Sequence, residues 1–370
     1  MNIVILNCFD TWGDRVDLLY RILKELGHSV KILCSDYQHV NKKRKVGVEK
    51  NYIYFSAEPY KRNISISRLH SHMQLSRDMF AFVKRHIRTI DLLWVLAPPN
   101  SFIYQAGLLK QQYPHICFIA DLIDLWPETM PINLMKKNPI FNIWMEIRNN
   151  NLYYADYVIT ECNLYKKILK ATAGDIQAET LYLAREDKGY NPCLNLPEKE
   201  IALCYLGSIN NIIDINAIER IIRDCTKKQP VIFHIIGEGE KKNLLIKTAK
   251  NAGAKVIYHG KVYDRLEKQQ IFDSCHYGLN IMKSSVCVGL TMKSIDYFEF
   301  GLPLINNIKG DTWDAVKTYD TGINYNGKFL DTGNYNISRR KNARCFFEAY
   351  LTDTIFKAMI SNIVLKKMNQ

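Results

Sequence analysis

The sequence predicts an α/β protein of two doubly wound domains, and three features support this prediction. Apolar runs of strand length alternate with amphipathic helical stretches from the first residues onward, as in residues 3–6, 16–26 and 29–34. This β-α-β order favours a parallel sheet with helices on both faces. The same alternation starts again at residues 201–206. A length of 370 residues suffices for two domains with separate cores.

The composition is that of a soluble globular protein, with 47% hydrophobic and 24% charged residues. We expect no secretory signal, because the N-terminus lacks a basic and apolar leader. We expect no membrane span either, because no apolar run approaches ~20 residues. The ten cysteines are scattered without a CxxC pair. The sequence therefore predicts buried thiols in a reducing cytoplasm and no metal site.

The formal net charge of +13 suits nucleic acid, an anionic membrane surface or anionic substrates as partners. The densest basic cluster is at residues 42–45, and no RNA-recognition, zinc-finger or basic-zipper motif accompanies it. We therefore expect no nucleic-acid partner. Two interpretations of the cluster remain: a solvated loop, or peripheral contact with the anionic inner face of the cell membrane or with a lipid pyrophosphate.

The first domain is predicted to span residues 1–185. Its strands are expected at residues 2–7, 29–34, 51–56, 91–96, 115–120 and 155–160, and its helices at 16–26, 69–86 and 139–154. Open α/β sheets bind ligands at the carboxyl ends of their strands. Trp12, in the loop after the first strand, and Asn100, after residues 91–96, are therefore candidate acceptor contacts. Tyr153 and Tyr154 are interpreted as core residues, with an exposed aromatic patch as the alternative.

Two carboxylates follow the strand at residues 115–120. Asp121 and Asp124 stand at its carboxyl end, where they can hydrogen-bond a sugar or assist proton transfer, so both are candidate catalytic residues. Trp126, two residues further on, is a candidate acceptor contact. The structural alternative is that Asp124 caps the following turn and that Trp126 belongs to the core.

The rest of the chain divides into three predicted parts. Residues 186–199 are rich in charge and proline and form the predicted linker. Residues 200–341 form the predicted second domain, and residues 342–370 form a predicted helical segment. Strands of the second domain are expected at residues 201–206, 231–236, 254–258, 277–282 and 304–305.

The stretch 289–303 carries the chemistry of the second domain. A small-residue loop leads into a helix N-terminus, where free backbone N–H groups and the helix dipole favour a phosphate or diphosphate. Asp296, about one turn into the helix, can accept hydrogen bonds from a ribose. The alternative is an ordinary strand-loop-helix unit without a ligand.

Three segments of the chain match a known family. Residues 293–297, followed by Gly301-Leu302-Pro303, resemble the donor-binding segment of glycosyltransferase group 1, a nucleotide-sugar-dependent family with the GT-B fold. Asp124 to Glu128 resembles an Asp-Leu-Trp-Pro-Glu sequence in bacterial members that build cell-surface polysaccharides. Gly207-Ser208 is similar to the start of the family's second domain.

The resemblance implies two Rossmann-like domains facing each other across a cleft, with a C-terminal helix that crosses back to the first. It implies a UDP-sugar as the expected donor, no metal ion and retention of anomeric configuration. It assigns donor-binding roles to Gly13, Gly207, Ser208, Gly239, Lys261, Val262, Gly289, Leu290, Thr291, Met292, Lys293 and Asp296.

The chain also departs from the family pattern. Members carry an acid at the position of Val288, and often an arginine and a lysine within the stretch that here reads Ile209 to Ile213. Lys293 or Lys283 is expected to supply that positive charge instead. The resemblance implies sugar transfer to a carbohydrate acceptor, carried on a lipid pyrophosphate, in bacterial capsule, O-antigen or exopolysaccharide synthesis. The alternatives are a non-catalytic GT-B partner subunit and a UDP-sugar epimerase.

Overall fold

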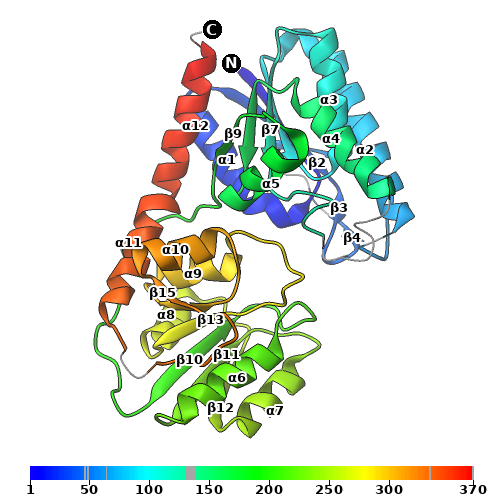
Figure 1. Cartoon of the computed structure of the whole chain (residues 1–370). Coiled ribbons are helices and arrows are strands. Elements are labelled where there is room, and N and C mark those ends of the chain that lie inside the picture. The colour runs from blue at the N-terminus through cyan, green and yellow to red at the C-terminus, as the bar shows by residue number, and fades with distance from the viewer. Residues whose placement is uncertain (46, 48–49, 64, 131–138, 333–334, 369–370) are drawn as a thin grey trace. The chain divides into compact units, whose positions relative to one another are not determined.

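The computed structural model describes residues 1–45, 47, 50–63, 65–130, 139–332 and 335–368. The chain divides into two compact units (Figure 1). The first comprises Met1–Ala184 together with Asp353–Gln370, and the second comprises Arg185–Thr352.

The first unit is built on a parallel sheet of seven strands in the order β5-β2-β1-β6-β7-β8-β9. The strands are β1 (Asn2–Asn7), β2 (Ser29–Ser35), β5 (Tyr52–Phe55), β6 (Leu92–Ala97), β7 (Cys117–Leu122), β8 (Tyr157–Thr160) and β9 (Ala178–Thr180). A short antiparallel pair, β3 (Tyr37–Gln38) and β4 (Lys43–Arg44), follows β2. The central strands are almost wholly apolar because helices cover both faces of the sheet.

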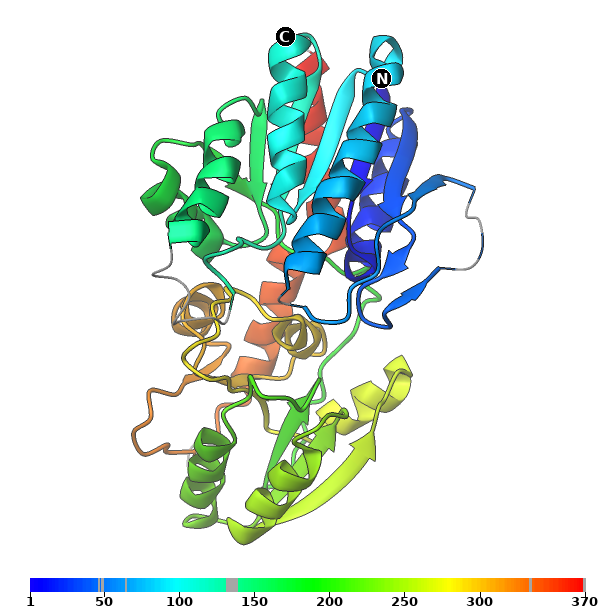
Figure 2. The same ribbon diagram turned by 90° about the vertical axis from the view of Figure 1, so that its right-hand side faces the viewer.

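Two hydrophobic cores, one on each face, hold the helices of this unit. The helices are α1 (Gly13–Glu25), α2 (Ile66–Arg85), α3 (Asn100–Gln112), α4 (Pro139–Leu152), α5 (Asn163–Ala173) and α12 (Asp353–Met368). One core takes buried residues from α2, α3 and α5, and the other takes them from α1 and α12. Helices α2 and α3 lie side by side (Figure 2).

Helix α12 returns to the first unit, which confirms the predicted C-terminal crossover. Phe356 and Ile360 pack in the same core as Val16 and Leu19 of α1. An ion pair of 2.8 Å between Lys357 and Glu25 joins the two helices at the surface. The crossover segment is shorter than the expected 342–370, because α11 (Ser338–Tyr350) belongs to the second unit. There, Phe346 of α11 packs on Phe298.

The second unit has a parallel six-stranded sheet in the order β12-β11-β10-β13-β14-β15. The strands are β10 (Ile201–Leu206), β11 (Val231–Ile236), β12 (Ala254–Gly260), β13 (Tyr277–Asn280), β14 (Leu304–Asn306) and β15 (Gly322–Asn324). The other helices are α6 (Ile215–Thr226), α7 (Lys242–Asn251), α8 (Arg265–Asp273), α9 (Met292–Glu299) and α10 (Asp311–Tyr319). Both units are thus doubly wound, as the sequence predicts.

The structure corrects two local expectations. Helix α2 begins at residue 66 rather than 69, because the Ser65 hydroxyl caps it by accepting the Arg68 N–H at 3.2 Å. Tyr153 and Tyr154 are not core residues, since they are 62% and 41% exposed. None of the ten cysteines forms a disulfide. Seven are buried, as expected, whereas Cys193 and Cys287 are half-buried and Cys345 is exposed. None of the helices in the described ranges is long and apolar enough to cross a membrane.

Candidate functional site

Lys293, in the first turn of α9, is a buried lysine of the second unit. It is 8% exposed, and its Nζ donates a hydrogen bond to the Tyr205 hydroxyl at 3.2 Å. That hydroxyl in turn donates to the Ser208 carbonyl at 2.9 Å. Burial lowers the pKa of Lys293 to about 7. No carboxylate of the described residues forms an ion pair with this ammonium, so its positive charge has only neutral partners.

Lys293 lies directly beside the loop that follows β10. A Cβ built on Gly207, whose φ is +115°, would be 3.7 Å from the Lys293 Cε. Ser208, the next residue, is exposed. Lys293, Gly207 and Ser208 are therefore neighbours.

The α9 N-terminus is rigid because a capping box closes it. The Thr291 Oγ1 accepts the Ser294 N–H at 3.1 Å, and the Ser294 Oγ accepts the Thr291 N–H at 3.0 Å. The Thr291 hydroxyl also donates to Asn280 Oδ1 at 3.0 Å. Thr291 is thus used within the fold rather than offered to a ligand. Met292 and Lys293 remain as first-turn residues whose N–H groups have no acceptor within the helix.

Gly289 and Leu290 are buried and lie in the loop directly before this helix. The Gly289 carbonyl accepts the N–H and the hydroxyl of Thr312, each at 2.8 Å. Thr312 belongs to α10, so this helix fixes the loop from behind. The two residues are accordingly positioned by the core of the unit, and not by α9 alone.

Asp296 lies among cations that sequence reasoning did not assign to it. Its Oδ1 is 3.7 Å from Arg185 Nη2 and 3.9 Å from Lys268 Nζ. Burial raises the pKa of Asp296, whereas Lys268, Arg185 and Arg265 act in the opposite direction. These cations come from α8 and from the start of the unit, far from Asp296 in sequence. Because these cations are distant from Asp296 in the sequence, no local sequence pattern could have identified them as its neighbours.

Gly239 has a packing role in the structure. A Cβ at this position would be 2.3 Å from the Ile209 carbonyl oxygen, and one at Gly237 would be 2.0 Å from the Gly207 carbonyl oxygen. The Ile209 N–H donates to the Glu238 carbonyl at 2.9 Å. The loops after β10 and β11 therefore interlock backbone against backbone, and only glycine permits this approach.

Lys261 and Val262 directly follow β12. Lys261 is exposed, whereas Val262 is 7% exposed. The Gly237 N–H donates to the Gly260 carbonyl at 2.6 Å, which ties their loop to the loop after β11. Since β10, β11 and β12 are parallel, the predicted donor residues of this unit gather at one edge of its sheet.

In the first unit, the structure corrects the assignment of Asp121 as a catalytic residue. Its side chain is fully buried, and both oxygens accept from Arg15, at 3.0 and 2.8 Å. The Trp94 Nε1 donates to the same carboxylate at 2.9 Å. Asp121 is therefore a structural partner of a buried arginine and has no access to a substrate.

Asp124 anchors the loop that follows β7. Its oxygens accept the Leu125 N–H at 2.9 Å, the Trp126 Nε1–H at 2.6 Å and the Thr129 hydroxyl. Burial raises the pKa of Asp124, and these hydrogen bonds oppose that rise. The oxygens of Asp124 are thus occupied by groups of its own loop. This agrees with the alternative interpretation, in which Asp124 caps the following turn.

The predicted acceptor residues differ in what the structure assigns to them. Asn100 is 1% exposed, and its Nδ2 donates to the carbonyls of Trp126 and Trp144, each at 3.0 Å, so its role is structural. Trp12 is half-buried and packs edge-on against Phe9, with centroids 4.9 Å apart. Gly13, predicted as a donor contact, begins α1, and apart from its chain neighbours and its own helix backbone, no atom of the described residues lies within 4 Å of a Cβ built on it.

A cluster that sequence reasoning missed surrounds Arg68 at the N-terminus of α2. The Arg68 Cζ lies 4.4 Å from the ring centroid of Trp126, 5.2 Å from that of Phe9 and 5.6 Å from that of Tyr60. The His72 ring packs against all three. The spacing of Arg68 and His72, four residues apart in a helix, is the one local signal that could have linked them.

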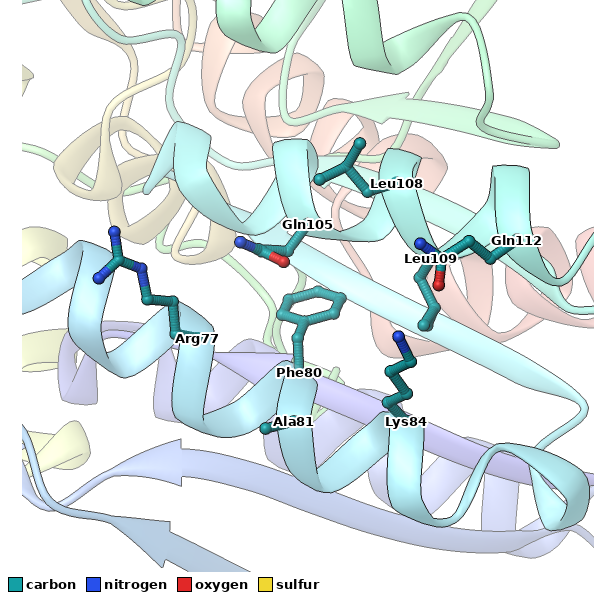
Figure 3. A pocket seen from close by; sticks show the side chains of 8 residues that line it. All are labelled: Arg77, Phe80, Ala81, Lys84, Gln105, Leu108, Leu109 and Gln112. Atoms are coloured by element: carbon teal, nitrogen blue, oxygen red, sulfur yellow. The ribbon is translucent and has the colours of Figure 1, made fainter.

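A surface groove of about 240 Å³ lies elsewhere on the first unit, between α2 and α3 (Figure 3). Arg77 and Lys84 of α2 and Gln105 and Gln112 of α3 line it. Phe80 forms its floor. It runs along helix faces rather than at strand ends, and we assign it no role in the site. Among the described residues, no group of three His, Cys, Asp or Glu side chains could hold a metal ion.

No family model matches the sequence, and no curated protein matches it. Solved structures do match the fold. The apo form of the lipopolysaccharide outer core galactosyltransferase WaaB aligns with a TM-score of 0.70 and 14% identity, over 99% of this chain and 100% of that one. HepE of Anabaena in complex with UDP aligns with a TM-score of 0.67 and 11% identity, over the same shares. MurG of Acinetobacter baumannii aligns with a TM-score of 0.55 and 8% identity, over 98% and 99%.

These alignments span both units and the C-terminal helix, so the chain has the GT-B fold, the architecture that the sequence resemblance implies. HepE was also solved with UDP-glucose, at a TM-score of 0.64 and 10% identity to this chain. At such low sequence identities, the structural likeness establishes the fold alone. The activity has to be argued from the residues of this chain.

Proposed function

We propose that this protein is a glycosyltransferase that moves a sugar from a nucleoside diphosphate sugar, in particular a UDP-sugar, to a carbohydrate acceptor. The observation that carries the proposal is the buried Lys293 ammonium beside Gly207, which has only neutral partners. A buried cation without an anion is costly, and a diphosphate bound at this point would neutralise it. The fold of UDP-binding HepE is consistent with this proposal.

The chemistry in this proposal is stabilisation of the leaving group. Negative charge grows on the diphosphate as the bond to the sugar breaks. Lys293, together with the first-turn N–H groups of Met292 and Lys293, would stabilise that charge. The rigid capping box keeps these donors in position before the reaction, so they need no reorganisation during it. Lys293 thereby takes the role of the basic pair that is missing from residues 209–213.

We propose the remaining donor contacts as well. Asp296, one turn after Lys293, would accept hydrogen bonds from the ribose hydroxyls. The backbone of Lys261 and Val262 would contact the base, and Gly207 and Ser208 the diphosphate. Gly239 supports the Gly207 loop by close packing. We further propose that Gly13 approaches the donor phosphate, since the space beside it is open.

The proposed reaction retains the anomeric configuration and uses no side-chain base from the first unit. Asp121 is fully engaged by Arg15, and Asp124 is engaged by its own loop. Asp124 therefore contributes by holding Trp126, whose ring would contact the acceptor together with that of Trp12. We propose that neither the donor site nor the reaction requires a metal ion.

The proposed setting is the synthesis of a bacterial capsule, O-antigen or exopolysaccharide, on an acceptor linked to a lipid pyrophosphate. The net charge of +13 and the basic residues 42–45 support peripheral contact with the anionic inner face of the cell membrane. In this setting the protein works in the cytoplasm, and no nucleic acid takes part.

A thermal-shift titration with UDP and UDP-sugars, beside GDP, dTDP and ADP-sugars, tests the donor site. A ligand at 100 times its dissociation constant stabilises the folded state by about 2.7 kcal/mol. We expect UDP ligands to raise the unfolding midpoint of the natural protein and of Lys317→Met, an exposed lysine on α10, by the same amount, and that of Lys293→Met by clearly less at the same ligand concentration. A folded protein whose midpoint no nucleotide shifts would overturn the proposal.

Val288 favours a second candidate, a GT-B partner subunit that binds nucleotide without catalysis, because an acidic residue is missing at that position. A UDP-sugar epimerase is the third. Acceptor-dependent release of UDP distinguishes the three: the transferase releases UDP only with an acceptor, the epimerase converts its donor without one, and the partner subunit does neither.

A further inference from the structure

Three asparagines stand side by side at the carboxyl ends of β13, β14 and β15 in the second unit. Asn280 lies opposite Asn306 in the parallel register, and Asn306 lies opposite Asn324. Asn280 and Asn306 are fully buried, and Asn324 is half-buried. Strands of a parallel sheet usually carry apolar residues at such positions, because burying an amide costs free energy unless its polar atoms are hydrogen-bonded. The row of amides therefore requires an explanation.

The three side chains form a continuous row of hydrogen bonds, which we call the asparagine row. Asn280 Nδ2 donates to Asn306 Oδ1, and Asn306 Nδ2 donates to Asn324 Oδ1, each at 3.0 Å. At one end of the row, Asn324 Nδ2 donates to the Trp313 carbonyl of α10 at 2.9 Å. At the other end, Asn280 Oδ1 accepts the hydroxyl proton of Thr291 at 3.0 Å. The row thus connects the N-cap of α9 with the first turn of α10.

The asparagine row has one direction, which its ends determine. A backbone carbonyl can only accept, so the Trp313 carbonyl requires the Nδ2 of Asn324 to face it. Each amide then presents its oxygen towards β13 and its nitrogen towards β15. Asn280 consequently offers an oxygen to Thr291, so the Thr291 hydroxyl is the donor in that contact. The lone pairs of this hydroxyl remain to accept a backbone N–H, which is the task of an N-cap residue.

The oriented Thr291 hydroxyl closes the first turn of α9. Its Oγ1 accepts the Ser294 N–H at 3.1 Å. Just before it, the Gly289 carbonyl accepts the N–H and the hydroxyl of Thr312, each at 2.8 Å. Thr312 precedes Trp313, so the two segments that the row connects are also bonded to each other directly. The loop before α9, the asparagine row and the start of α10 therefore form a closed ring of hydrogen bonds, and a fully satisfied buried network of this kind is rigid.

We propose that Asn280 and Asn306 are positioning residues of the donor site, which hold the Thr291 cap in place and thereby aim the first-turn N–H groups of α9 at the diphosphate. This inference rests on the proposed sugar transfer from a nucleoside diphosphate. Both asparagines are fully buried, so they act through other residues and do not touch the donor themselves. They act through Met292 and Lys293, whose N–H groups follow the cap directly. Donors that are fixed in advance stabilise the charge of the leaving diphosphate without reorganisation.

The test interrupts the asparagine row at two places. Asn306→Leu removes the central amide, and Thr291→Val replaces the hydroxyl at the end of the row with a methyl group of similar size. Leu245→Ala, a core residue of α7 whose side chain takes no part in the row, is the control for a loss of stability alone.

Calorimetry, well below the unfolding midpoint of each protein, measures the dissociation constants of UDP and uridine. We expect both row variants to bind UDP about fivefold more weakly or worse, the loss that corresponds to one misplaced hydrogen bond. Uridine has no diphosphate, so its affinity should stay within about twofold of the natural value. Leu245→Ala should bind both ligands as the natural protein does.

Two further measurements distinguish positioning from general destabilisation. The double variant of Thr291→Val and Asn306→Leu should bind UDP no more weakly than the poorer binder of the two single variants, because both substitutions act through one cap. Hydrogen exchange at the amides of Thr291 and Ser294, which the capping box protects, should be about tenfold faster in Asn306→Leu than in Leu245→Ala.

The inference is overturned if the natural protein binds UDP while both row variants keep its ratio of UDP to uridine affinity, if the losses of the two single variants add, or if the exchange of the cap amides is unchanged. Should Asn306→Leu fail to fold, the affinity ratio and the cap exchange of Thr291→Val decide. A natural protein that binds no UDP overturns the proposed function, and this inference with it, so the two failures are told apart by UDP binding of the natural protein.

Discussion

Arg15 and Asp121 form a two-point ion pair in the interior of the first unit, with nitrogen–oxygen distances of 2.8 and 3.0 Å. The pair joins α1 to the end of β7, at the sheet edge where a catalytic carboxylate was expected. Its side chains are 1% and 0% exposed. The carboxylate that resembles a catalytic group in the sequence is therefore part of the scaffold.

Asp121→Asn should destabilise the protein by about 3–5 kcal/mol, because it leaves the buried Arg15 charge without its partner. Urea denaturation, followed by tryptophan fluorescence, measures the change. The double variant with Arg15→Met should recover much of the loss, since it removes the orphaned charge as well. An Asp121→Asn protein of normal stability that has lost only its activity would restore Asp121 as a catalytic candidate.

The stability contributed by Lys293 should rise with pH. Its pKa in the folded protein is about 7, below the usual 10.5, so the unfolded chain binds more protons between these values. Stability should therefore increase by up to about 1.4 kcal/mol per pH unit above pH 7, relative to Lys293→Met. The measurement is the difference in unfolding free energy between the two proteins from pH 6 to pH 9. A difference that stays constant over this range would contradict the depressed pKa.

The same titration has the opposite effect on binding. Only the protonated Lys293 attracts a diphosphate, so UDP affinity should fall as pH rises above 7. Lys293→Met should lack this pH dependence over the same range. Isothermal titration calorimetry at pH 6.5, 7.5 and 8.5 measures the affinities. If the natural protein and the variant share one pH profile, a group other than Lys293 binds the diphosphate.

Asp296→Asn and Lys293→Met should affect different parts of the donor. The asparagine keeps the shape of Asp296 but removes its charge, so uridine and UDP should both bind several-fold more weakly. Lys293→Met should weaken UDP by tenfold or more and leave uridine unchanged, because uridine has no phosphate. Binding of both ligands to both variants, measured by calorimetry, is the test. Equal losses for uridine and UDP in Lys293→Met would indicate a distorted site instead.

Gly239→Ala and Gly13→Ala form a matched pair of glycine substitutions. The added Cβ at residue 239 would be 2.3 Å from the Ile209 carbonyl oxygen, so we expect a destabilisation of about 1–3 kcal/mol. At residue 13 it meets no atom within 4 Å, and we expect a stabilisation of up to ~1 kcal/mol at the start of α1. Denaturant midpoints measure both. Reduced UDP affinity in Gly13→Ala, with unchanged stability, would support the proposed donor contact at Gly13.

Much of the fold could be predicted from local sequence. Apolar runs such as residues 201–206 are long enough to form buried strands, and glycine and proline separate them from the helices. The return of α12 to the first unit came from the resemblance to a family, since no local pattern specifies a partner for its apolar face. The error over Tyr153 and Tyr154 has the same origin, because their burial depends on what packs against the turn that follows α4.

The sequence by itself determined the two doubly wound units and the segment around Lys293, since both depend on short-range periodicity and on residues adjacent in the chain. Only the tertiary structure decided which charges are compensated. Arg15 neutralises Asp121 from 106 positions away, whereas Lys293 and Arg68 are buried beside neutral partners. The cost of a charge depends on its burial and on the groups within a few ångströms. Folding brings those groups together from distant positions, so no stretch of sequence records them.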